Sequence, residues 1–138
     1  MKIKKAIRII LTCVLISGML TSCEVEEEKT PAEMLVGKWI ISYSELLTQE
    51  FPGDGSFLQF DECNSSCSGI DYNESKKTTG NFTYVLNEDA SILDISDPSG
   101  DGENYNFSWD ILELSDTELK ITADTGLFGT MKIVLKKE

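Results

Sequence analysis

Apolar and polar residues alternate along most of the chain from residue 35 onward. A period of two is typical of strands with one buried and one exposed face, and turn-forming residues separate the alternating segments at intervals of roughly 8 to 15 residues. The segments expected to form strands are Leu35–Tyr43, Ser56–Asp61, Asn81–Leu86, Ser91–Ile95, Asn104–Ile111, Glu118–Ile121 and Met131–Lys136. No helical period separates them. We therefore expect an all-β fold, an antiparallel up-and-down meander of about seven or eight strands that closes as a small barrel or folds as a sandwich.

The clearest alternation lies in Asn104–Ile111. Its aromatic and apolar residues share one parity and therefore one face: Tyr105, Phe107, Trp109 and Ile111. The next two leucines, Leu112 and Leu114, have the opposite parity. This change predicts a bulge or bend near Asp110–Glu113.

A short helical turn is expected just before the first strand. Thr30 is a good capping residue, Pro31 suits the first helical position, and Glu33 stands three residues after the cap, as in a capping box. Gly37 follows soon afterwards. The helix should therefore have only one or two turns.

The first residues have the organisation of a secretory signal. Basic residues come first, an apolar stretch from Ile9 to Leu20 follows, and small residues precede a cysteine. The apolar stretch is shorter than the roughly 20 residues of a membrane-spanning helix, which disfavours a transmembrane anchor. Leu20-Thr21-Ser22-Cys23 resembles the lipobox of bacterial lipoproteins. The resemblance implies a signal peptide (1–22), a lipid on Cys23, an acidic tether (23–30) and one domain (31–138).

The charge of the chain limits its partners. Removing the signal peptide would discard four basic residues and no acidic one, so the formal net charge of −12 would become −16. Nucleic acids require a basic surface, and anionic lipid head groups repel acidic proteins. We therefore expect no nucleic-acid partner, and membrane contact only through the lipid on Cys23. The acidic run after that cysteine is either a solvated tether or an export signal. The second interpretation rests on its similarity to the acidic run that directs Bacteroidetes-type lipoproteins to the cell surface. That similarity implies an outer-membrane lipoprotein that faces outward.

Cys63 and Cys67 remain once the signal is removed and Cys23 is acylated. An even pair in an oxidising compartment favours a disulfide, and the turn-forming segment Asn64-Ser65-Ser66 allows the chain to bring the two cysteines together. A redox or metal role is the alternative interpretation. It lacks support, because the chain has no histidine and the spacing is not Cys-x-x-Cys.

Signals of catalysis are sparse. The chain contains no histidine and no Gly-x-Ser-x-Gly elbow, and its acidic residues are too numerous for any pair to be informative. We expect no enzymatic activity and no cofactor. A weak calcium candidate consists of Asp97, Ser99, Asp101 and Glu103. Ser108 stands where a calcium loop needs its bidentate glutamate, so an acidic hairpin loop is the favoured interpretation.

Gly37-Lys38-Trp39, opening a series of up-and-down strands after a helical turn, resembles the start of the lipocalin-like lipoproteins of Bacteroidetes. The resemblance covers about Pro31 to Lys137. It implies a barrel with the indole of Trp39 packed across one end. The chain is shorter than true lipocalins and has no helical pattern after its last strand, which predicts a narrow barrel that its own side chains can fill.

Several aromatic residues could line a ligand site, although side chains with this spacing more often fill a core. They are Trp39, Tyr43, Phe60, Tyr84, Tyr105, Phe107 and Trp109. The leading hypothesis is a lipoprotein that binds a small apolar or amphipathic ligand inside the barrel or near its mouth. The alternative is a filled barrel that acts as a protein-interaction or inhibitor module with an envelope partner.

Overall fold

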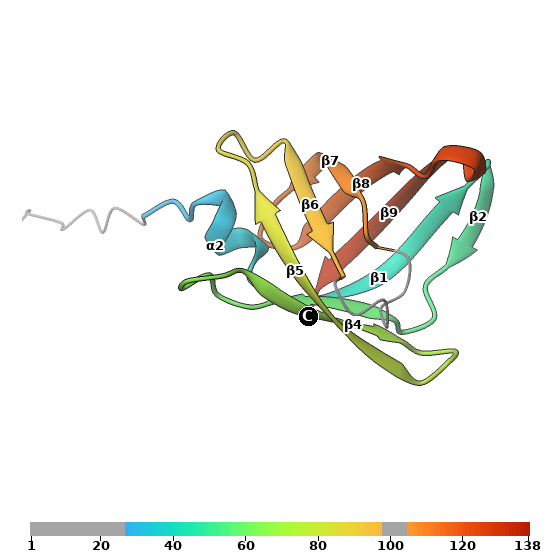
Figure 1. Ribbon diagram of the computed structural model, residues 1–138, viewed down its shortest axis with the longest axis horizontal. Helices are drawn as coiled ribbons and strands as arrows, with labels where there is room; N and C mark the ends of the chain where they lie inside the picture. The colour runs from blue at the N-terminus through green and yellow to red at the C-terminus, as the bar shows by residue number, and fades with distance from the viewer. Residues whose placement is uncertain (1–26, 98–104) are drawn as a thin grey trace, which may run out of the picture.

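The computed structural model describes residues 27–97 and 105–138 (Figure 1). A short helix, α2 (Pro31–Leu35), precedes the strands, and a 3-10 turn, η1 (Gly126–Phe128), lies between the last two. The strands are β1 (Gly37–Leu46), β2 (Gln49–Pro52), β3 (Phe57–Phe60), β4 (Ser68–Asn73), β5 (Thr78–Leu86), β6 (Ile92–Ser96), β7 (Ser108–Leu114), β8 (Glu118–Asp124) and β9 (Thr130–Lys137).

The strands form a closed antiparallel barrel. From β3 to β8, each strand pairs with the next one along the chain. Strand β1 pairs with both β3 and β9 and so closes the ring. In the described part of the chain, eight strands make the ring and one short α-helix accompanies it. The expected all-β meander is confirmed, in the barrel form rather than the sandwich form. All of these strands, and the core that they enclose, lie within residues 31–138.

The ninth strand, β2, extends one edge of β1. Because β9 occupies the other edge along Trp39–Leu46, β2 and β3 both pair with the remaining edge, as one strand interrupted at residues 53–56. The amide of Gly53 donates to the carbonyl of Ser42 at 3.0 Å. A Cβ on Gly53 would lie 2.1 Å from the carbonyl oxygen of Ile41, so only glycine allows the two chains to approach this closely.

Apolar side chains fill most of the interior of the barrel, where Asp71 is a buried charged residue. Fifteen hydrophobic residues are buried in one cluster, and Trp39 and Trp109 have no exposed surface. Each tryptophan donates its Nε1 hydrogen to a carbonyl four residues earlier, Trp39 to Leu35 at 2.7 Å and Trp109 to Tyr105 at 2.9 Å. The buried indoles therefore satisfy their polar atoms while they fill the core.

The two ends of the barrel differ. At the α2 end lie the β3–β4 and β5–β6 connections, as well as the starts of β1 and β8; at the far end lie η1 and the β1–β2 turn (Figure 1). The hydroxyl of Thr30 accepts from the amide of Glu33, and the Glu33 carboxylate accepts from the Thr30 amide at 2.7 Å. The predicted capping box and helical turn are confirmed. Lys137 Nζ donates to the carbonyl of Met34 at 2.6 Å and ties α2 to β9.

Several strand boundaries differ from those expected. Leu35 belongs to α2 and not to the first strand, because the capping box starts the helix at Pro31. Strand β7 begins at Ser108, so Tyr105 and Phe107 precede it. The bulge expected near Asp110–Glu113 is confirmed, since the register of β7 against β8 shifts between Ile111 and Glu113. Strands β2 and β4 were not expected.

Candidate functional site

The aromatic residues proposed as a ligand set occupy three different environments. Four of them belong to the buried core, with exposed fractions of 0 to 4%: Trp39, Phe60, Tyr84 and Trp109. Tyr105 and Phe107 are half-buried and pack against Trp109, with ring centroids 6.5 and 5.9 Å from its ring. Phe60 and Tyr84 meet edge to face, with centroids 5.1 Å apart. The four buried rings therefore pack against other side chains in the core.

Tyr43 lies on the outer face of the barrel. Ile41 pairs with Leu135 and Tyr43 with Val134, so Ser42 is an extra residue that reverses the parity of β1. The Tyr43 hydroxyl donates to Glu45 Oε2 at 3.3 Å. Partial desolvation, together with the carboxylates of Glu50 and Glu45, raises the pKa of Tyr43 to about 12.

The disulfide between Cys63 and Cys67 is confirmed, with the two Cα atoms 4.4 Å apart. It closes the β3–β4 connection at the α2 end. The Tyr84 hydroxyl donates to the carbonyl of Asp61 at 2.7 Å and lies 3.2 Å from Cys63 Sγ. Burial, followed by the charge of Asp61, raises the pKa of Tyr84. The side chain of Tyr84 therefore links the disulfide loop to the core.

A groove of about 500 Å³ runs between α2, this disulfide and the end of β5. We call it the α2 groove. Its surface is mainly apolar, and its lining residues are Thr30, Pro31, Ala32, Cys63, Cys67, Tyr84, Val85, Leu86, Asn87, Glu88 and Ala90. Val85 is an outward-facing residue of β5 with 63% of its surface exposed. A half-open apolar groove with a few polar groups at its margin is the usual form of a small-molecule site.

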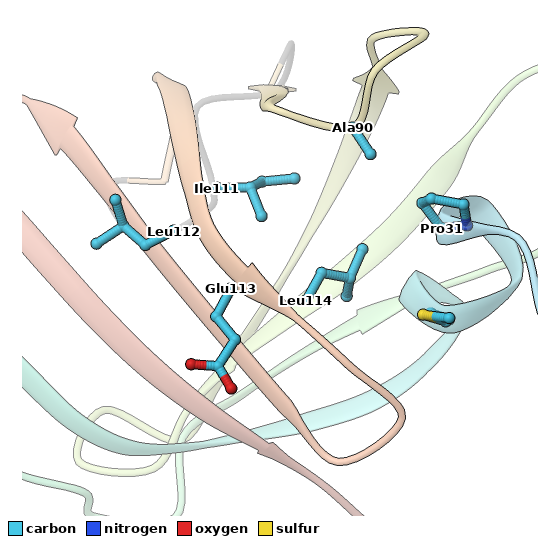
Figure 2. Close-up of a pocket in the computed structure, with 7 residues that line it drawn as sticks. Pro31, Ala90, Ile111, Leu112, Glu113 and Leu114 are labelled. Carbon is cyan, nitrogen blue, oxygen red and sulfur yellow. The ribbon is translucent and has the colours of Figure 1, made fainter.

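Besides a hollow of about 890 Å³ that is lined by Glu27, Glu28, Lys29, Met34 and Asp116, two other hollows adjoin α2. One, of about 410 Å³, shares Ala32 and Cys63 with the α2 groove and is also lined by Glu33, Val36, Glu62 and Asn64. The other, of about 250 Å³, lies between α2 and β7 (Figure 2). Ile111, Leu112, Glu113 and Leu114 line it on the β7 side, and in Figure 2 the side chains of Leu112 and Glu113 point away from the helix. Of the hollows beside α2, the α2 groove exposes the most apolar surface.

Carboxylates, and no basic side chains, line the α2 groove and the hollow that shares Ala32 and Cys63 with it. Glu88 lies at the margin of the first, and Glu33 and Glu62 line the second. The backbone amide and side chain of Thr30 bond to Glu33 and lower the pKa of its carboxyl. Glu62 and Glu88 are exposed. This end of the barrel therefore presents an apolar groove with an acidic margin.

The sequence singled out only part of this groove: Tyr84 belongs to the predicted ligand set, and Cys63 and Cys67 form the predicted disulfide. It did not single out the other lining residues for a site. Pro31 and Ala32 come from the helix, whereas Val85 and Leu86 come from the end of a strand and Ala90 from a turn. Among these other residues, Val85 carried a signal, because it is an apolar residue at an outward position between Tyr84 and Leu86.

Other predicted sites lie partly or wholly outside the described residues. Of the calcium candidate, Asp97 is described, but Ser99, Asp101 and Glu103 are not. Within residues 27–97 and 105–138, no group of three or more acidic or cysteine side chains could hold a metal ion. Cys23, with its predicted lipid, also lies outside the described residues. Among the helices in the described part of the chain, none is long and apolar enough to cross a bilayer.

The comparisons with known proteins support the fold. No protein-family model matches the chain, and no curated protein matches it. Among solved structures, the barrel is similar to a lipocalin-like protein from Bacteroides uniformis, with a TM-score of 0.51 and 17% sequence identity. The match covers 76% of this chain and 99% of that protein. At this identity the likeness is one of fold, and it supports a lipocalin-like barrel.

Proposed function

We propose that the protein is a non-catalytic envelope lipoprotein, anchored through Cys23, whose lipocalin-like barrel binds a small apolar or amphipathic molecule in the α2 groove. The observation that carries this proposal is the apolar groove of about 500 Å³ beside a core that its own side chains fill. The proposal thus places the ligand at the mouth of the barrel and not inside it.

The packing of the core favours this position. A ligand inside the barrel would have to displace side chains such as Trp39 and Phe60, which are 0 and 1% exposed. Each such side chain gains roughly 1.5 to 3 kcal/mol from burial, so displacing several would cost more than a small ligand returns. The α2 groove needs no such displacement.

The groove can supply a modest affinity. Each buried methylene contributes about 0.8 kcal/mol, so an alkyl chain that buries six of them gains about 5 kcal/mol. Ordering the chain in the groove removes part of that gain. We expect a dissociation constant of about 1 mM for a simple alkyl ligand.

The predicted tether would join the barrel at the end where the groove lies. The acidic tether (23–30) leads directly into the Thr30 cap of α2, and Thr30, Pro31 and Ala32 line the groove. A lipid on Cys23 would therefore hold this end close to the membrane. A ligand taken from or delivered to the bilayer would meet the groove first.

The test measures binding of the neutral fluorophore N-phenyl-1-naphthylamine to residues 27–138 through the change in fluorescence emission of the dye. The native chain should bind it, and Val85→Asp should weaken binding at least tenfold, because it places a charge in the apolar wall. Leu127→Asp is the matched control: Leu127 is 99% exposed at the far end, so this variant should bind like the native chain. Absence of binding, or equal binding by Val85→Asp, would contradict the proposal.

A further inference from the structure

We infer that the α2 groove selects amphiphiles with a cationic head group over those with a neutral or anionic one. This inference rests on the proposed function and adds the charge of its ligand. It follows from the charges at this end of the barrel: Glu88 lies at the margin of the groove, Glu33 and Glu62 line the adjoining hollow, and no basic side chain lines either one.

The acidic side chains are placed where a head group would lie. Glu88 lines the groove at the β5–β6 turn. Glu62 lines the adjoining hollow, beside Cys63, which lines both the hollow and the groove. Both glutamates are exposed, and within the described residues neither forms an ion pair with a lysine or arginine. Their negative charge is therefore available to a ligand whose alkyl chain occupies the apolar wall.

The basic residues nearest to α2 have other partners. Lys29 forms an ion pair with Asp116 at 2.8 Å, on the side of β8. Lys137 donates to the Met34 carbonyl at 2.6 Å, and its Nζ lies 4.9 Å from the centre of the Trp39 ring. Burial lowers the pKa of Lys137. Neither lysine lines the groove, so neither can receive an anionic head group there.

The size of the preference follows from exposed charge pairs. Each such pair contributes little to the binding free energy because water and salt screen it. A change of head group from cation to anion, however, converts attraction into repulsion at two or three carboxylates at once. We expect about a tenfold difference between a cationic amphiphile and its neutral counterpart, and a further loss for an anionic one. The difference should shrink in high salt.

The overall acidity of the protein would also attract cations, and the experiment must separate this effect from the local one. Three amphiphiles with the same twelve-carbon chain serve as probes below their micelle-forming concentrations: dodecyltrimethylammonium, dodecyl maltoside and dodecanoate. Their affinities for residues 27–138 are measured by isothermal titration calorimetry. The variant Glu62→Gln/Glu88→Gln removes the local charges. The matched control Glu50→Gln removes a charge on β2, far from the groove.

The expected order of affinity is cation, then neutral, then anion. The double variant should bind the cation about fivefold more weakly and the maltoside unchanged, whereas Glu50→Gln should match the native chain. Dodecanoate or maltoside binding as tightly as the cation would overturn the inference and leave the proposed function intact. So would a cation preference that survives in the double variant, since it would then come from overall charge. Failure of all three probes to bind would overturn the proposed function itself.

Discussion

Replacing Trp39 by phenylalanine tests how the helix that walls the groove is held. The indole Nε1 donates to the Leu35 carbonyl at 2.7 Å, at the last residue of α2, and the ring is completely buried. Phenylalanine keeps most of the apolar contact but cannot donate. The carbonyl of Leu35 then loses a buried hydrogen bond, and the smaller ring leaves part of the space empty.

The two losses can be summed roughly. A buried polar group left without its partner costs about 1 to 3 kcal/mol, and the lost apolar surface costs about 1 kcal/mol. We therefore expect Trp39→Phe to lower the free energy of unfolding by about 2 to 4 kcal/mol. For a domain of this size that corresponds to a fall in Tm of about 10 to 25 °C.

Thermal unfolding of residues 27–138, followed by far-UV circular dichroism, measures this change. Trp109→Phe is the matched comparison, because Trp109 is equally buried and donates in the same way, to the Tyr105 carbonyl at 2.9 Å. Both variants should lose stability, but only Trp39→Phe should also weaken N-phenyl-1-naphthylamine binding, since only Trp39 bonds to α2. A Tm for Trp39→Phe within about 3 °C of the native value would refute the reasoning.

Two further predictions concern the predicted anchor and the outer face. Cys23→Ala should leave the protein unprocessed and absent from the membrane fraction after cell fractionation; a processed, membrane-bound variant would contradict the lipoprotein proposal. Tyr43→Phe should remove a phenol that titrates with a midpoint near 12, seen as lost absorbance change at 295 nm. Because the folded state holds this proton more tightly than the unfolded chain, whose phenol titrates near 10, stability should fall as the pH rises from about 10 to about 12, and less so in Tyr43→Phe. An unchanged titration would refute the assigned pKa.

The barrel was largely predictable because most strands bury one face and expose the other. The missed strands break that rule. In β4 the inward positions carry Gly69 and Asp71, and the apolar residues Ile70 and Tyr72 fall on the outer parity. The inward glycine is required, because a Cβ there would lie 2.4 Å from an atom of the Phe82 ring. Strand β2 is short, exposed at every position and ends in proline, so it has no alternation to detect.

The candidate site was much less predictable. The bulge in β7 was visible as a change of parity. The extra residue in β1, Ser42, was not, because Ile41 and Tyr43 continue one alternation in the sequence. The α2 groove combines residues from a helix, a disulfide loop and a strand end. Such a surface depends on how elements far apart in the sequence meet, and no local pattern of residues encodes it.

The pairing of β1 with β9 also determines when the barrel can close during synthesis of the chain. These strands are the first and last of the ring, and Trp39 pairs with Lys137, close to the end of the chain. Contacts between such distant residues are slow to form, because the intervening chain must first be ordered. The barrel cannot close until the final strand has been synthesised. A chain that stops before β9 would leave β1 and β8 as open edges, and open edges of this kind associate with those of other molecules.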